Sequence, residues 1–254
     1  MDASGSERVV IAGLPVARLG TAEVVDRVFH ALSGAQGGWV VTANLDFMQR
    51  AYEDPDSREL YSRADLIVAD GAPLVWAARL MGKPLPDRVA GSDLVWLFAE
   101  RAAREGRSLF LLGGDGEDGK VAAERLVERY PGLKIAGVAS PKLSSPPTDS
   151  ELKEVRELVA AARPDLVYAG FGSPKQERVI EALRPSLPGA WMMGCGISLS
   201  FMAGTVARAP RWMQNSGLEW LHRMLSEPRR LAPRYLRNIP YAFRLLWNAR
   251  FIES

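Results

Sequence analysis

Residues 64–71 read ADLIVADG, an apolar run that ends at an acid and a glycine. A short apolar run between turn residues is typical of a strand buried on both faces of a sheet. Residues 74–81 follow it with a helical pattern. The arrangement recurs, and the predicted elements are strands at residues 38–42, 64–69, 108–112, 133–138, 165–171 and 191–194 and helices at residues 45–61, 74–81, 94–105, 120–130, 150–162 and 174–183. This alternation predicts an α/β fold, a Rossmann-like and mostly parallel sheet flanked by helices.

The composition is that of a soluble globular protein. Of the 254 residues, 47% are hydrophobic and 24% are charged, which excludes disorder, collagen and coiled coil. The single cysteine, Cys195, excludes a disulfide framework and a cysteine-based zinc site, and two histidines leave little material for a histidine-rich metal site. Neither a signal peptide nor a membrane-spanning apolar segment is visible, so a cytoplasmic protein is expected.

The charge of the chain is divided unevenly. Residues 205–254 contain nine arginines, no lysine and three acids, a net charge of +6, whereas residues 1–204 sum to −4. Seven aromatic residues lie in the same basic segment. We therefore expect an α/β core at residues 1–204 and a C-terminal helical appendage at residues 205–254 that lies on an anionic membrane surface. A docked helical pair with a solvated basic face is the second interpretation, and the acidic core argues against the third, nucleic-acid binding.

Candidate ligand-binding residues follow the predicted strands. In a parallel sheet the carboxyl ends of the strands meet at one edge, where glycine turns and helix N-termini offer free N–H groups. The polar and glycine residues at these ends include Thr42, Asn44, Asp70, Gly71, Gly113, Gly114, Asp115, Gly170, Gly172, Ser173, Lys175, Gln176, Gly194 and Gly196.

Several of these candidates also have a purely structural interpretation. The turn at Gly113 and Gly114 is either a phosphate cradle or a tight strand-to-helix turn, since no GxGxxG motif is present. Asp70 is either a general base at a strand end or the N-cap of the next helix. The Asp54-Pro55-Asp56 run matches a metal-binding DxD pattern, but its place at the start of a helical stretch favours a cap.

Longer motifs resemble a known family. They are TANLD at residues 42–46, ADG at 69–71, KPLPDRVAGSD at 83–93, GFGSPKQE at 170–177, GCG at 194–196, RAPRWMQ at 208–214, GLEWL at 217–221 and EPRR at 227–230. In this order they resemble the WecG/TagA/CpsF family of bacterial glycosyltransferases, glycosyltransferase family 26, over about residues 10–240. The chain departs from that pattern at a stretch rich in proline and serine, residues 140–150, which contains no predicted catalytic residue.

The resemblance implies an inverting, metal-independent transfer without a cofactor. The donor would be a UDP-sugar and the acceptor a polyprenol-diphosphate-linked sugar, in the synthesis of teichoic acid, enterobacterial common antigen, capsule or exopolysaccharide. The transferred sugar would be N-acetylmannosamine, its uronic acid or a hexose such as glucose. By motif, Asp70 is the general base, and Thr42, Asn44, Arg88 and Gln176 line the same pocket. Among the substrate-binding residues, those assigned to the diphosphate are Arg208, Arg211 and Arg230.

The resemblance also implies a location. The protein would be peripheral on the inner face of the plasma membrane, with residues 205–254 helping to close the active site. A homo-oligomer is left open. The alternative to an enzyme is a non-catalytic nucleotide-sugar-binding module, which would keep the glycine turns without needing Asp70.

Overall fold

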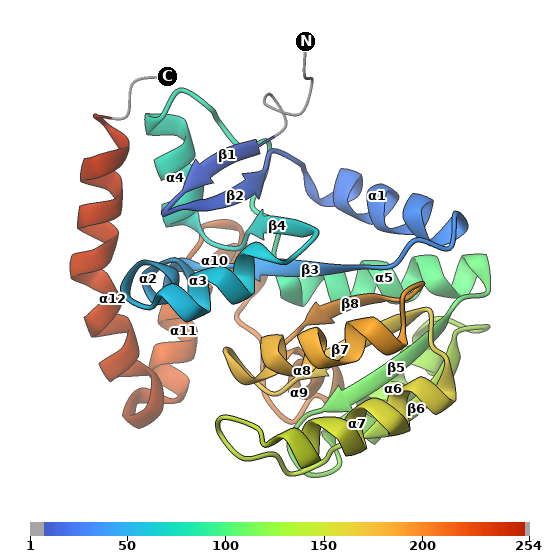
Figure 1. Cartoon of the computed structure of the whole chain (residues 1–254). Coiled ribbons are helices and arrows are strands. Elements are labelled where there is room, and N and C mark those ends of the chain that lie inside the picture. Colours follow the sequence, from blue (N-terminus) through green and yellow to red (C-terminus); the bar gives the residue numbers. More distant parts are fainter. Residues whose placement is uncertain (1–7, 252–254) are drawn as a thin grey trace.

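The computed structural model describes residues 8–251, and the strands of this range form one eight-stranded sheet (Figure 1). The order across the sheet is β1-β2-β4-β3-β8-β7-β5-β6, with every neighbouring pair parallel except β1 and β2. The strands are β1 (Arg8–Ile11), β2 (Leu14–Ala17), β3 (Gly38–Ala43), β4 (Leu66–Ala69), β5 (Ser108–Gly113), β6 (Lys134–Ala139), β7 (Leu166–Gly170) and β8 (Trp191–Gly194). The predicted α/β fold with a mostly parallel sheet is confirmed.

Helices cover both faces of this sheet. One buried cluster joins the sheet to α2 (Leu45–Glu53), α3 (Pro55–Ser62), α4 (Ala72–Leu80), α7 (Asp149–Ala162) and α8 (Lys175–Leu183). The other joins it to α1 (Thr21–Ser33), α5 (Gly91–Glu105), α6 (Asp118–Arg129) and α9 (Ser198–Ala203). Neighbouring residues of β3 show this division, because Trp39 and Val41 belong to the first cluster and Val40 to the second.

Two local features differ from the sequence prediction. The β1–β2 hairpin was not predicted, because its turn is only Ala12 and Gly13, both at positive φ, and Pro15 lies within its second strand. The predicted helix at residues 45–61 is two helices. Asp54 separates them, and its carboxylate accepts hydrogen bonds from the N–H groups of Asp56 and Ser57 at 3.2 Å each. The cap interpretation of the Asp54-Pro55-Asp56 run is therefore confirmed.

The connections that follow β8 and its two neighbouring strands leave the sheet toward opposite faces. β8 lies between β3 and β7, and the helices that follow those two neighbours, α2 and α8, pack on one face. The helix that follows β8 itself, α9, packs on the opposite face. Where successive connections diverge in this way, the carboxyl ends of the strands border a crevice in which ligands bind.

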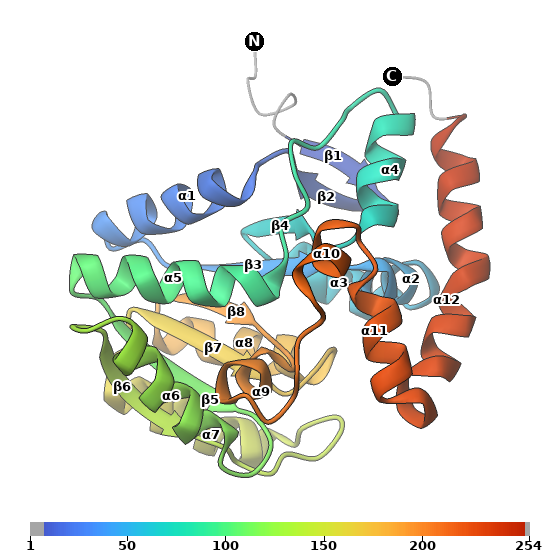
Figure 2. The same cartoon turned by 180° about the vertical axis from the view of Figure 1, so that it is seen from behind.

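Three helices form the C-terminal segment, α10 (Arg211–Asn215), α11 (Glu219–Ser226) and α12 (Pro228–Ala249). α12 lies beside α2 and α4, α11 packs against α12, and α10 packs against α11 (Figure 2). Leu245 and Ala249 of α12 are buried in the first core cluster, and the Tyr241 hydroxyl donates to the Met48 carbonyl at 3.0 Å. Within residues 8–251, no helix combines the length and hydrophobicity that a membrane crossing requires. These helices are the appendage expected at residues 205–254, although its boundary as a separate domain stays a prediction.

Gly113 at the end of β5 has a conformation and a neighbour that exclude a side chain. Its φ is +97°, and a Cβ placed there would lie 2.7 Å from the Gly170 carbonyl oxygen. Gly116, in the same turn, also has positive φ (+53°) but has open space around its Cβ position. A side chain at either position would meet backbone strain, but only at Gly113 would it also clash with a neighbour. A comparison of the two positions therefore separates the cost of strain from the cost of the clash.

We predict that Gly113→Ala lowers the free energy of unfolding by about 3 kcal/mol, since left-handed strain and the clash add. Gly116→Ala, the matched control, is expected to cost about 1 kcal/mol because strain alone acts. Urea denaturation of both variants measures the difference. Equal losses would contradict the account of the Gly113–Gly170 contact.

Candidate active site

A cavity of about 530 Å³ lies between the carboxyl ends of β3 and β4 and the appendage. The segments that follow these two strands form one wall, and α11 and α12 form the other. Of the residues predicted to form the site, Asn44, Asp70, Gly71 and Arg88 line it. The structure thus brings together residues that lie up to 44 positions apart in the core and encloses them with helices from the far end of the chain.

Asp70 is held at the cavity wall by its neighbours. Its N–H donates to the Ala43 carbonyl at 2.7 Å, which ties it to the end of β3. Its Oδ2 accepts from the Gly91 N–H at 3.1 Å, at the start of α5. The cap interpretation for the following helix is wrong, since α4 begins after Gly71 with no side-chain cap. Asp70 instead connects two strand ends and the first residue of α5.

The charge state of Asp70 suits proton transfer. Burial raises the pKa of its carboxyl to about 6, whereas the Arg88 charge and the Gly91 N–H hold that pKa down. The Arg88 Nη1 lies 3.4 Å from Oδ1, and the Asp70 side chain keeps 26% of its surface exposed. The carboxylate is therefore ionised at neutral pH, reachable from the cavity, and closer in pKa to neutrality than an ordinary aspartate, which is the property of an effective general base.

Thr42 and Asn44 support the same end of β3 in different ways. A Cβ at Gly91 would lie 2.7 Å from the Thr42 Oγ1, so the glycine lets α5 begin directly against this threonine. The Asn44 Oδ1 accepts from the Asp46 and Phe47 N–H groups at 3.0 and 3.3 Å and caps α2. The amide nitrogen of Asn44 is the part of the side chain left to reach a ligand.

The appendage contributes arginines that the sequence motifs did not select. Arg223 and Arg234 line the cavity, and the Nε of each is buried without a hydrogen-bond partner in the described part of the chain. Arg234 Nε lies 3.9 Å from the Asp46 Oδ1, which is itself buried and unbonded. The Nε–H donors of both arginines are therefore already positioned at the cavity but have no acceptor. Guanidinium groups with unused donors inside a cavity fit a phosphate ligand.

The three arginines predicted from motifs do not line this cavity. Arg208 is bound by Asp93 at 2.6 Å and Glu219 at 3.1 Å, so it holds the appendage to α5. Arg230 pairs with Glu227 at the exposed start of α12, and Arg211 is exposed on α10. Their binding of a diphosphate stays a prediction. For Arg223 and Arg234 the sequence offered only one indication, that they lie in the basic segment. Which arginines of that segment face the cavity is decided by the packing of α11 and α12.

Gln176 lies outside the cavity, at the neighbouring strand ends. Its side chain is buried, its Oε1 accepts from the Gly196 N–H at 3.0 Å, and its Nε2 donates to Glu177 at 2.8 Å. A Cβ at Gly194 would lie 2.4 Å from that Nε2. Gln176 therefore fixes the turn after β8, and a direct role in catalysis stays a prediction.

The remaining predicted residues also gather at the ends of β5, β7 and β8 rather than in the cavity. The Gly114 N–H donates to the Gly170 carbonyl at 2.9 Å, the Lys175 Nζ donates to the Leu143 carbonyl at 2.8 Å, and the Ser173 hydroxyl lies 3.2 Å from the Tyr61 hydroxyl. Asp115 is exposed, and Gly172 has open space around its Cβ position. The contact of this second group with a nucleotide stays a prediction.

Comparison with known proteins agrees with this architecture. The profile described as the glycosyl transferase WecG/TagA/CpsF family matches residues 9–254. A protein of Bacillus spizizenii strain W23 is 33% identical over 195 residues, which span 77% of this chain and 74% of the relative. A protein of Staphylococcus aureus strain MRSA252 is 30% identical over 241 residues, 94% of this chain and 92% of the relative. Both relatives are named N-acetylglucosaminyldiphosphoundecaprenol N-acetyl-beta-D-mannosaminyltransferase.

Proposed function

The chain belongs to the WecG/TagA/CpsF family of glycosyltransferases, and we propose that it transfers a sugar from a UDP-sugar to a polyprenol-diphosphate-linked sugar. The observation that carries this proposal is the cavity in which Asp70 meets unsatisfied arginines. The relatives' names make N-acetylmannosamine the first candidate for the transferred sugar and N-acetylglucosaminyl-diphosphoundecaprenol the first candidate for the acceptor.

The proposed reaction is a single inverting displacement. Asp70 removes the proton from the acceptor hydroxyl while the hydroxyl oxygen attacks the anomeric carbon of the donor. The bond from that carbon to the diphosphate of UDP breaks at the same time. Arg88 keeps the Asp70 carboxylate ionised, and Gly91 fixes one of its oxygens. The other oxygen, Oδ1, faces Arg88 at 3.4 Å, a distance long enough for an acceptor hydroxyl to compete for it.

We assign the developing negative charge of the diphosphate to Arg223 and Arg234. Within residues 8–251 their buried Nε atoms have no hydrogen-bond partner, so a phosphate that enters would supply an acceptor that the protein does not. Preorganised donors of this kind stabilise charge that forms in a transition state. We assign the rest of the nucleotide to the glycine turns after β5 and β7, next to the N-terminal ends of α6 and α8.

The mouth of the cavity fits a lipid-linked substrate. Trp76 of α4, Trp220 of α11 and Phe243 of α12 line the cavity and are also exposed. Such apolar side chains between a charged cavity and the surface suit the first isoprene units of a polyprenol. The cavity therefore matches an acceptor that is charged at one end and apolar at the other.

We further propose that the appendage rests on the inner face of the plasma membrane. Leu236, Phe243 and Trp247 of α12 and Phe251 just after it recur at intervals of seven, four and four residues and are all exposed. We call these four residues the outer strip. Aromatic residues on a basic helix favour the interface of an anionic bilayer, which is where a lipid-linked acceptor is held.

Replacement of Asp70 tests the enzymatic proposal against the binding-module alternative. Asp70→Asn is expected to lower turnover by about 10²–10⁴-fold, the usual contribution of a general base, while UDP binding changes little. In the unmodified protein, turnover should rise with pH and level off above about 6, since the carboxyl must be ionised to accept a proton. Steady-state rates across pH and calorimetry with UDP provide the measurements.

Asp87→Asn is the matched control, because Asp87 is exposed, lies in the motif that contains Arg88, and does not line the cavity. It should leave both turnover and its pH dependence unchanged. Full turnover in Asp70→Asn would favour the non-catalytic module, and an equal loss of UDP affinity would assign Asp70 to binding.

The arginines allow a second comparison within the appendage. Arg223→Ala and Arg234→Ala should each lower kcat/KM by about tenfold or more, because each removes a charged donor from the cavity. Arg211→Ala removes the same charge from an exposed position and should change kcat/KM by less than about twofold. A larger effect at Arg211 would support the motif-based assignment over the one drawn from the cavity.

A further inference from the structure

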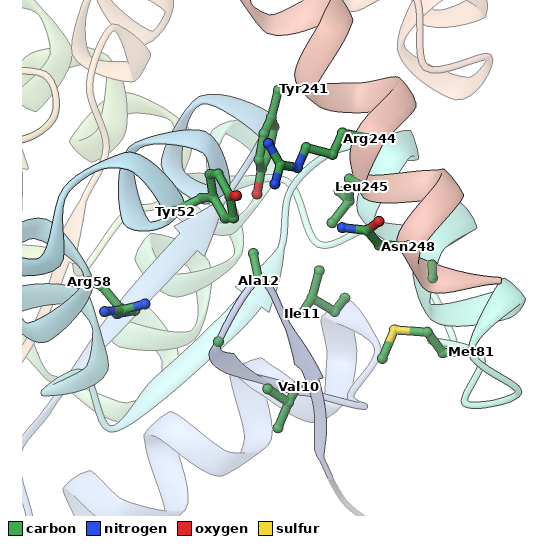
Figure 3. A pocket seen from close by; sticks show the side chains of 12 residues that line it. Val10, Ile11, Ala12, Tyr52, Arg58, Met81, Tyr241, Arg244, Leu245 and Asn248 are labelled. Carbon is green, nitrogen blue, oxygen red and sulfur yellow. The ribbon is translucent and has the colours of Figure 1, made fainter. Parts of the chain in front are cut away.

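A second cavity lies on the other flank of α12. It has a volume of about 360 Å³. It is bordered by the β1–β2 hairpin, by Tyr52 of α2 and Arg58 of α3, and by the last turns of α12 (Figure 3). We call it the hairpin pocket. It shares no lining residue with the candidate active site. Nothing in the proposed transfer reaction uses it.

The hairpin pocket carries unbalanced positive charge. Arg58 and Arg244 line it, and none of its lining residues is acidic. Within residues 8–251 neither guanidinium has a carboxylate or hydrogen-bond partner, and Arg244 lies over the Tyr52 ring at 4.6 Å (Figure 3). The nearby Glu53 already accepts from the Gln49 Nε2 at 2.6 Å. Both guanidinium groups therefore keep their donors for an anion.

Apolar side chains make up a large part of the remaining lining. Ile11 and Met81 are buried at the pocket, Val10 is exposed beside them, and Leu245 and Ala249 complete the wall on α12. A free inorganic anion gains no favourable contact from these apolar side chains. A ligand with a phosphate at one end and hydrocarbon at the other would satisfy both the arginines and the apolar side chains.

The hairpin pocket also adjoins the outer strip. Arg244 and Asn248 of the pocket each directly follow a strip residue, Phe243 and Trp247, which are 73% and 63% exposed. When the strip lies in the interfacial layer of a bilayer, the side chains next to it lie among the headgroups. The pocket then faces the phosphates of the surrounding lipids.

We propose that the hairpin pocket binds the phosphate headgroup of an anionic phospholipid. Arg244 donates to the phosphate, Arg58 adds positive charge from another side of the pocket, and Val10, Met81 and Leu245 contact the first carbons of the lipid. This inference rests on the proposed membrane association of the appendage and is independent of the role of Asp70. A lipid held on one flank of α12 fixes the rotation of that helix on the membrane and so presents the cavity on its other flank to the acceptor.

Soluble dihexanoyl phosphatidylglycerol, kept below its micelle concentration, tests the pocket without a bilayer. Calorimetry should show saturable binding at one site on the full chain. The dissociation constant should rise by about tenfold or more in Arg58→Gln/Arg244→Gln, since charge-assisted hydrogen bonds are lost. Val10→Trp, which fills the mouth without a change in charge, should give a similar loss.

The control is Arg229→Gln/Arg250→Gln, which removes the same charge from exposed positions of the appendage outside the pocket. It should bind the soluble lipid as the unmodified protein does. Inorganic phosphate should bind more weakly than the lipid by about tenfold or more, because it gains nothing from the apolar wall. Phosphate binding as tight as lipid binding, or no effect of the pocket variants, would overturn the proposal.

Flotation with phosphatidylcholine vesicles that contain phosphatidylglycerol separates this inference from the membrane proposal. Vesicle binding that Val10→Trp weakens supports the pocket. Vesicle binding unchanged by Val10→Trp overturns the pocket and leaves the membrane proposal standing. No vesicle binding by a chain that still binds the soluble lipid overturns the membrane proposal alone. Transfer to a soluble acceptor should be equal in all pocket variants.

Discussion

The site depends on one bridging side chain, Arg88. Its Nη1 lies 3.4 Å from the Asp70 carboxylate and its Nη2 donates to the Gln214 carbonyl at 3.2 Å, so one guanidinium joins the end of β4 to the appendage. It also offsets the effect of burial on the Asp70 pKa. Arg208 reinforces the connection through Asp93 and Glu219. The charge state of the carboxylate and the closure of the cavity over it are therefore coupled.

α12 has three functional sides in this account. Its inward side brings Arg234 and Asn238 to the active-site cavity, its opposite flank brings Arg244 and Asn248 to the hairpin pocket, and the outer strip lies between them on the surface. Tyr241, through its bond to the Met48 carbonyl, fixes the rotation of the helix on the core. A single helix can thus relate the orientation of the protein on a membrane to the shape of the substrate cavity.

Sequence periodicity and motifs predicted the parallel sheet, most of the helices that cover it and the place of Asp70, because buried apolar strands that end in glycine and acid have few alternatives. They missed the β1–β2 hairpin, because Pro15 lies within its second strand and its two-residue turn, Ala12 and Gly13, is not a typical turn sequence. They also selected Arg208, Arg211 and Arg230 over Arg223 and Arg234. Motif position does not reveal which side of α11 or α12 faces the core, and that choice follows from tertiary packing. Likewise, the position of Gln176 in a first helical turn did not reveal that its side-chain oxygen accepts a hydrogen bond from the Gly196 N–H.

The most direct test of the central claim is acceptor-dependent release of UDP. A panel of UDP-linked N-acetylmannosamine, its uronic acid, N-acetylglucosamine and glucose would be offered with a soluble polyprenol-diphosphate-sugar analogue and EDTA. The account predicts release from one donor, dependent on the acceptor and undiminished by the chelator. Release that requires a divalent metal would contradict the assignment of the diphosphate charge to arginines, and failure to bind UDP at all would contradict the proposed function.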